Sequence, residues 1–213
     1  TFTTTFEITV RDLDYSPLEY ITTNNTQYLN TGIKTTANTK IVITMDKPAD
    51  FNGNTWLFNS QPKGGGTKTI GLNLKDNGGF TFDYAGKRYG TVSGVDVKTG
   101  EINWQEGKNV LTIGNGEFKI NDSVLATGLE NVTDLPAAST ANLVFFTSLT
   151  TDAKDFFEAK VYSIAIYNGD TLVMNLIPAQ ELDGQTRVGF YDTVSGNWFF
   201  SAVSGTAFAG PTA

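Results

Sequence analysis

The sequence has neither cysteine nor histidine among its 213 residues. Without cysteine there can be no disulfide and no thiolate metal site. Without histidine the chain lacks the usual general base, the usual zinc ligand and the usual pH-sensitive side chain. Any catalysis would therefore depend on carboxylates, lysine, tyrosine or a hydroxyl with an unusual base. Long apolar runs are missing too: no window holds about 18 consecutive apolar residues, so no membrane-spanning segment is predicted.

Positive charge is scarce. The chain has 15 Lys and Arg against 22 Asp and Glu, which gives a formal net charge of -7. An acidic chain gains nothing from a phosphate backbone or an anionic membrane surface, so neither nucleic acid nor a membrane is an expected partner. Charged residues make up 17% of the chain, below the roughly 25% typical of soluble domains. Thr, Asn, Gly and Ser supply the polar surface instead, as is common in extracellular and virion β-proteins.

Short β-type runs separated by Gly, Asn and Asp turns fill the sequence. Residues 1–10 alternate apolar and polar side chains, which predicts a half-buried strand. Residues 69–84 read as a hairpin around Asp76-Asn77-Gly78-Gly79, whose residues tolerate positive φ. No segment has a sustained helical period with caps, and at most a single helical turn is expected, within 134–141. Further strands or strand groups are predicted at residues 40–45, 55–61, 108–128, 142–149, 157–168, 171–179 and 187–201.

About a dozen short strands in a chain of this length predict an all-β fold, a two-sheet antiparallel sandwich. Pro17 breaks the first alternating run. Residues 1–16 are therefore expected to be an N-terminal strand or linker, in one interpretation the end of a preceding domain. Residues 17–213 are expected to form one sandwich domain. The chain begins with Thr rather than Met, so we expect a processed chain or a fragment.

Both ends of the chain carry recognisable motifs, LEYITTNNTQYLNTGI at 18–33 and FFEAKVYSIAIYNGDTLVMNLIPAQELDGQTRVGFYDTVSGNWFFSAVSGTAFAG at 156–210. Over about residues 17–210 the sequence resembles the concanavalin A-like, laminin-G-like jelly-roll modules of phage virion proteins and bacterial surface proteins. The resemblance implies a jelly-roll sandwich, the concanavalin A-like lectin/glucanase fold, with the first and last segments side by side. It also implies that residues 28–32 form a turn that caps an early strand. Three aromatic side chains are then expected to close the core: Phe190, Trp198 and Phe200.

The resemblance leaves the function open, because family members bind glycans, bind proteins, decorate capsids, build tail fibres or act as spacers. An extracellular attachment module on a phage virion or a bacterial surface is favoured, with a glycan or cell-surface polysaccharide as its partner. The alternative is a structural decoration or fibre domain whose partners are other virion proteins or copies of itself. A glycoside hydrolase is the third possibility. The Glu-x-Asp-x-x-Glu pattern that places paired carboxylates on one strand face is absent, so the chain is expected not to be an enzyme.

Glycan sites use aromatic platforms and a few planar polar groups. The stretch DYAGKRYG, residues 83–90, places two aromatic and two cationic side chains in and beside a turn. The alternative interpretation is that the Tyr and Trp side chains belong to the core or its rim. The candidate glycan-binding residues are Asp83, Tyr84, Lys87, Arg88 and Tyr89, together with Asn59, Gln61, Trp56 and Trp104.

Calcium is the one metal that the resemblance implies, since lectins of this fold often hold it near the sugar. Calcium takes six to eight oxygen ligands. The carboxylate-rich stretch TDAKDFFE offers Asp152, Asp155 and Glu158. The alternative is a solvated loop that runs into a strand, since Asp, Asn and Gly are also what turns require. No other cofactor is expected.

Overall fold

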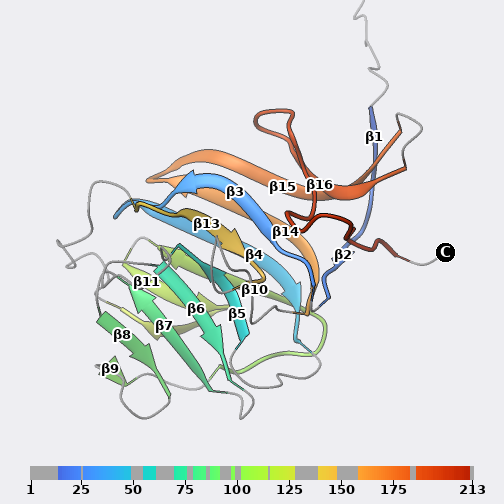
Figure 1. Ribbon diagram of the computed structural model, residues 1–213. Helices are drawn as coiled ribbons and strands as arrows, with labels where there is room; N and C mark the ends of the chain where they lie inside the picture. The colour runs from blue at the N-terminus through green and yellow to red at the C-terminus, as the bar shows by residue number, and fades with distance from the viewer. Residues whose placement is uncertain are drawn as a thin grey trace, which may run out of the picture.

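The structure is a computed structural model that describes residues 14–24, 26–48, 55–60, 70–75, 79–84, 87–91, 97–98, 102–114, 116–127, 139–147, 158–182 and 186–211. These residues form strands, turns and bends with no helix among them, so no helix that could span a membrane is found in them. The strands make two sheets that pack face to face (Figure 1). The predicted all-β, two-sheet antiparallel sandwich is confirmed.

The ten-stranded sheet has the neighbour order β12, β11, β10, β4, β14, β15, β16, β17, with β1 beside β15 and β2 beside β14. It contains the described parts of the strand groups predicted at residues 40–45, 108–128, 157–168, 171–179 and 187–201. Its strands are β1 (Tyr15–Pro17), β2 (Ile21–Thr22), β4 (Thr39–Asp46), β10 (Lys108–Gly114), β11 (Glu117–Ile120), β12 (Ser123–Ala126), β14 (Lys160–Asn168), β15 (Thr171–Glu181), β16 (Val188–Asp192) and β17 (Trp198–Phe199).

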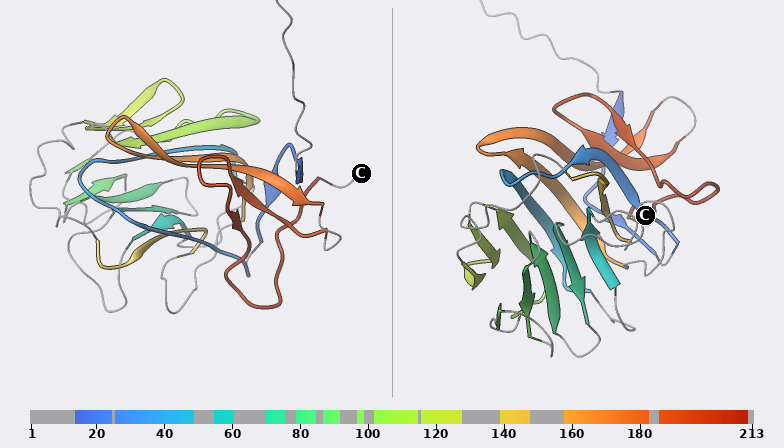
Figure 2. Two further views of the ribbon diagram at one scale, coloured as in Figure 1. Left: turned by 90° about the horizontal axis from the view of Figure 1, so that it is seen from above. Right: turned by 60° about the vertical axis from the view of Figure 1, so that its left-hand side comes forward.

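The seven-stranded sheet has the order β3, β13, β5, β6, β7, β8, β9. Its pairings are antiparallel except that β8 and β9 run parallel. Seen from above, the two sheets form two layers (Figure 2). The strands of this sheet are β3 (Leu29–Lys34), β5 (Thr55–Asn59), β6 (Ile70–Leu74), β7 (Phe80–Tyr84), β8 (Lys87–Gly90), β9 (Val97–Lys98) and β13 (Asn142–Phe145).

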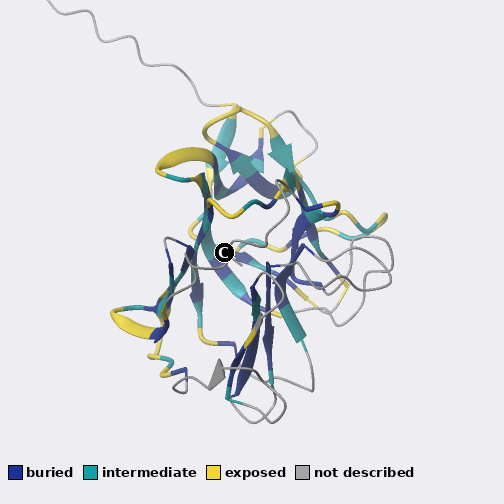
Figure 3. Ribbon diagram, turned by 90° about the vertical axis from the view of Figure 1, so that its left-hand side faces the viewer, coloured by how far each residue is buried: buried dark blue, intermediate teal, exposed yellow. Residues whose placement is uncertain are grey.

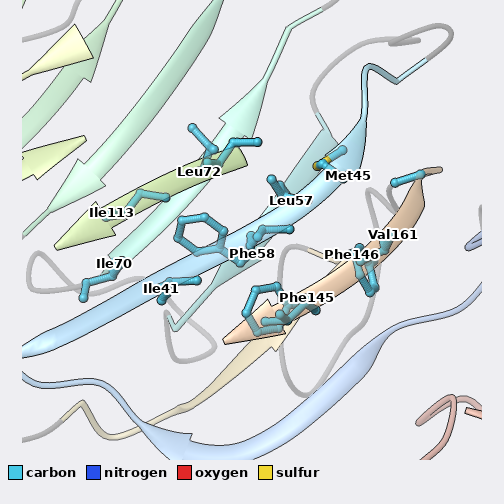
Figure 4. Close-up of a cluster of buried hydrophobic side chains, with 14 of the residues drawn as sticks. Ile41, Met45, Leu57, Phe58, Ile70, Leu72, Ile113, Phe145, Phe146 and Val161 are labelled. Atoms are coloured by element: carbon cyan, nitrogen blue, oxygen red, sulfur yellow. The ribbon is translucent and has the colours of Figure 1, made fainter. Parts of the chain in front are cut away.

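The core lies between the layers and is built from period-two apolar positions of both sheets. Phe118 of β11 meets two rings of β7 across the gap, with centroids 5.4 Å from Phe80 and 5.2 Å from Phe82. β6 is buried along its whole length and β7 along most of it. Figure 3 shows buried residues in dark blue. Figure 4 shows side chains of both sheets gathered in this layer, including Phe58, Leu72 and Phe145 from one sheet and Ile41, Ile113 and Val161 from the other.

The first and last described segments lie side by side, as the family resemblance implies. β1 pairs with β15, where Tyr15 lies opposite Glu181, and an isolated bridge joins Thr22 to Ala209. β1 spans the expected domain boundary, so Tyr15 and Ser16 belong to the same sheet as the residues after them. The predicted strand at 1–10 lies outside the described residues, as do most of 134–141, and the division at residue 16 stays a prediction for the rest of the N-terminal segment.

The turn expected at residues 28–32 is wrong, because Leu29–Lys34 is strand β3. Gly32 adopts φ of +72° inside this strand, and its backbone N–H donates a hydrogen bond to Asn30 Oδ1 at 3.0 Å. The pairing with β13 shifts register at this point. Asn and Gly, which usually mark turns, here form an irregularity within a strand.

The assignment of Trp198 to the core is also wrong. In the hairpin of β16 and β17, Phe190 lies opposite Phe199, and Tyr191 lies opposite Trp198. Phe190 and Phe199 therefore share the face that packs on the core, whereas Trp198 lies on the other face and is half-buried. There its ring stacks on Phe200, which is also only half-buried, at a centroid distance of 5.5 Å.

Truncating the ring that joins the two layers tests the packing. We expect Phe118→Ala to lower the free energy of unfolding by about 3–5 kcal/mol, the usual cost of deleting a buried ring. Urea unfolding followed by circular dichroism measures it. Val124→Ala on the neighbouring strand β12 is the control, because Val124 is 47% exposed and its truncation is expected to cost within about 0.5 kcal/mol. Equal losses in the two variants would contradict the described core.

Candidate functional site

Alternate residues of β5 to β8 point away from the core and form what we call the outer face of the seven-stranded sheet. Phe82 of β7 faces Phe118 of the other sheet, so its neighbour Asp83 lies on the opposite side of the strand. The register places Asn59, Gly71, Asp83 and Arg88 opposite one another on four adjacent strands. These four residues therefore make one continuous row across the outer face.

A second row runs beside the first and begins with an indole. Trp56, Asn73 and Thr81 lie opposite one another on β5, β6 and β7. The Trp56 ring reaches diagonally over Gly71, where an added Cβ would lie 2.6 Å from indole Cζ3 and 3.1 Å from Asn59 Oδ1. The absence of a side chain at Gly71 is what allows the indole and the amide to close over the backbone.

One buried polar side chain of the outer face, Asn73, has an oxygen without a hydrogen-bond partner among the described residues. Asn73 is 2% exposed. In the part of the chain that the structure describes, its Oδ1 and Thr55 Oγ1 are the buried side-chain oxygens without a hydrogen-bond partner. Leaving a buried acceptor open costs about 1–3 kcal/mol. Because the oxygen is buried, a hydroxyl or N–H of a ligand would recover that cost only where the side chains that cover Asn73 move aside.

An ion pair lies at the β8 end of the first row. Arg88 donates Nε to Asp83 Oδ1 at 2.5 Å and a terminal nitrogen to Asp83 Oδ2 at 2.8 Å. The Arg88 side chain is 50% exposed and the Asp83 side chain 15%. Since the bidentate contact uses both carboxylate oxygens and holds the guanidinium in plane, the pair presents donors and acceptors in a fixed orientation at the open end of the face.

Four of the residues expected from the sequence come together on this face: Trp56, Asn59, Asp83 and Arg88. Tyr84 and Tyr89 do not join them, since both are core residues, 3% and 4% exposed. They alternate with Asp83 and Arg88 along β7 and β8, so their rings point inward to Phe82. Neither ring presents a face to a ligand.

The remaining candidates lie elsewhere. Trp104 is half-buried, packs on the core and precedes β10 of the other sheet. Lys87 lies opposite Tyr84 in β8, and its side chain is not described. Gln61 lies outside the described residues.

Three residues of the face were not expected from the sequence, namely Gly71, Asn73 and Thr81. The signal was present in IGLNL, residues 70–74, where Gly and Asn alternate with three apolar residues. Because alternate residues of a strand face opposite sides, this pattern puts both polar positions on the face away from the core.

The expected calcium ligands fall largely outside the described residues, which include neither Asp152 nor Asp155. Glu158 is described, is exposed and lies just before β14. Among the described residues no group of three acidic side chains is placed to hold a metal ion. The calcium site therefore stays a prediction.

No protein-family model matches the chain, and no curated protein does. Several solved structures match the chain at low identity and with TM-scores below 0.5. The NanB sialidase of Streptococcus pneumoniae is 10% identical, with 92% of this chain and 39% of that chain covered at a TM-score of 0.44. The sialidase of Trypanosoma rangeli is 18% identical, with 61% of this chain and 20% of that chain covered at a TM-score of 0.42. The leech intramolecular trans-sialidase is 12% identical, with 91% of this chain and 38% of that chain covered at a TM-score of 0.42.

The chain spans about a fifth to two-fifths of the length of these solved structures. All three are sialidases or trans-sialidases, which are enzymes, and this finding contradicts the expectation that the chain is not an enzyme. The physical reason is that one missing carboxylate motif excludes one kind of glycoside hydrolase and not the others, since sialidases use a tyrosine nucleophile. At identities of 10–18% and TM-scores of 0.42–0.44, the likeness carries nothing about this chain's own substrate or reaction.

A methyl group at Gly71 tests the geometry of the face. We expect Gly71→Ala to displace the Trp56 indole, since the added carbon would lie 2.6 Å from Cζ3, and to destabilise the protein by about 1–3 kcal/mol, as overpacking does. Near-ultraviolet circular dichroism and urea unfolding measure the two effects. In a Trp56→Ala background most of this cost should vanish, because the clashing ring is gone. An additive double mutant would contradict the described contact.

Proposed function

We propose that the chain is a glycan-binding β-sandwich module and that the outer face of the seven-stranded sheet is its binding site. The observation that carries the proposal is the buried, unsatisfied acceptor of Asn73, which lies opposite Trp56 in the second row. Sugar rings present C–H groups that pack on aromatic faces and hydroxyls that pair with planar polar groups. Both kinds of partner occur here within two adjacent rows of strands β5 to β8.

The amides and the ion pair give the site its direction. Asn59 ends β5 and is 1% exposed, so its amide is fixed within the face. Asp83 and Arg88 lie two and three strands away from Asn59 in the same row. A saccharide that extends across the face from β5 toward β8 would first meet the Trp56 indole. It would then meet the amides of Asn59 and Asn73, and last the ion pair on β7 and β8.

Charge favours an uncharged saccharide. The guanidinium of Arg88 is neutralised by Asp83, and the whole chain carries a net charge of -7. An acidic glycan would approach against this field, whereas a neutral one would not. Surface display on a phage virion or a bacterial cell is the setting that the sequence resemblance implies, and it forms part of the proposal.

A glycan array tests the proposal, with neutral, sialylated and cell-wall polysaccharides probed in calcium and in chelator. We expect saturable binding to neutral glycans, and Trp56→Ala to weaken it at least tenfold, the equivalent of about 1.4 kcal/mol. Trp104→Phe is the control, since Trp104 lies away from the face. Loss of binding in chelator alone would support a calcium ion near the sugar.

Silence across the array, or equal binding by Trp56→Ala, would reject the site. Silence would shift the interpretation to a structural domain whose partners are proteins. Because the matched solved structures are sialidases, release of free sugar from the same glycans is measured in parallel. Turnover by the wild type that is lost in Trp56→Ala would show that the same face carries a reaction.

Asn73 permits a test that separates binding from stability. We expect Asn73→Leu, which keeps the approximate size of the side chain, to raise the free energy of unfolding by about 1 kcal/mol, because a buried unsatisfied oxygen is removed. Glycan binding should fall at the same time. Urea unfolding and the array measure the two changes. Asn109→Leu is the matched control: this buried amide makes four hydrogen bonds, so its replacement should destabilise the chain. A loss of stability in Asn73→Leu would indicate that its oxygen is already satisfied.

A further inference from the structure

A pocket of about 440 Å³ opens at the edge of the sandwich, away from the outer face. One wall comes from β3 of the seven-stranded sheet and the segment that follows it. The other walls come from the hairpin of β14 and β15 and from the hairpin of β16 and β17, all in the ten-stranded sheet. Pockets of roughly 300–1,000 Å³ are the usual size for small-molecule sites.

The floor of this pocket is apolar and is part of the folded core. Ile166 is fully buried and Met174 is 6% exposed. Ile33 and Phe199 are partly buried and pack against the same core cluster. A ligand resting on the floor would therefore meet rigid apolar surface, including one aromatic ring.

The rim carries amides that the fold does not use. Asn168 ends β14, and Asn197 precedes β17. Both line the pocket, both are exposed, and the side chain of neither makes a hydrogen bond with the described residues. Each amide offers two donors and an acceptor.

Asp192 holds the rim in shape and is not itself available to a ligand. This carboxylate is 1% exposed. Its Oδ1 accepts from the backbone N–H groups of Asn175 at 2.8 Å and Val194 at 3.1 Å. Its Oδ2 accepts from Ser195 N at 3.3 Å and Ser195 Oγ at 2.6 Å. With four donors engaged, the carboxylate fixes the turn that presents Asn197.

We propose that this pocket is a second saccharide site, for one or two neutral pyranose units. An apolar floor with an aromatic ring suits the C–H face of a pyranose, and free amides at the rim suit its hydroxyls. A wholly apolar ligand would leave both amides unpaired. The pocket shares no residue with the outer face, so its occupancy does not depend on the function proposed for that face. Two sites on one chain would let weak contacts combine on a polymeric glycan.

Two adjacent exposed residues of β15 give a matched test. Val173 and Leu172 are each 37% exposed, but only Val173 lines the pocket. Lactose, maltose, cellobiose and N,N′-diacetylchitobiose are titrated into the full chain by calorimetry and by saturation-transfer NMR. We expect one of them to bind wild type and Leu172→Trp alike, and Val173→Trp, which fills the pocket, to weaken that binding at least tenfold. Asn197→Ala, at an exposed position, should weaken it about threefold to tenfold.

Trp56→Ala separates the two sites. It should leave binding in the pocket unchanged, whereas Val173→Trp should leave binding at the outer face unchanged. If Val173→Trp does not fold, the sugar titration of Asn197→Ala decides whether the pocket is the binding site. The proposal is overturned if none of the four sugars binds at 10 mM, a probe concentration on the order of weak single-site affinities, or if neither Val173→Trp nor Asn197→Ala alters binding.

Discussion

The contact of Phe118 with two β7 rings joins the two layers of this protein at one point of a larger shared core, and it requires a fixed register of the strands on both sides. A slip of one residue in β7 would turn Phe80 and Phe82 outward and Asp83 inward. Such a slip would expose apolar rings and bury a carboxylate away from Arg88. The same alternation that builds the core therefore also sets which polar residues reach the outer face, and the core and the candidate site are two sides of one constraint.

Much of the fold could be predicted from periodicity and turn residues alone. The strands around 40–45, 69–84, 108–128 and 171–179 follow from short-range patterns that the sheets preserve. The errors arise where residue type and long-range pairing disagree. Gly32 is of a residue type that is common in turns but lies within β3, where the pairing with the partner strand shifts its register. Trp198 looks like a core residue by its size, yet the pairing of Phe190 with Phe199 places it on the opposite face.

The candidate site was only partly accessible from the sequence. Asp83 and Arg88 could be named because they lie beside a turn with aromatic neighbours, and Trp56 and Asn59 because an aromatic ring and an amide are side chains of ligand-binding type. Tyr84 and Tyr89 were named for the same reason, but strand alternation sends them into the core. The alternation in residues 70–74 places Asn73 on the outer face, but its missing hydrogen-bond partner is a property that only the folded neighbourhood defines. The pocket at the sandwich edge was likewise out of reach, because it joins residues from β3 to β17.

The close approach of Trp56 to Gly71 has a consequence for the entropy of recognition. An exposed tryptophan samples several rotamers and gives up that freedom when a partner holds it still. Here the indole already lies against the backbone of β6 at Gly71. The ring's rotational freedom is lost when the protein folds, so a partner that meets it has little left to immobilise.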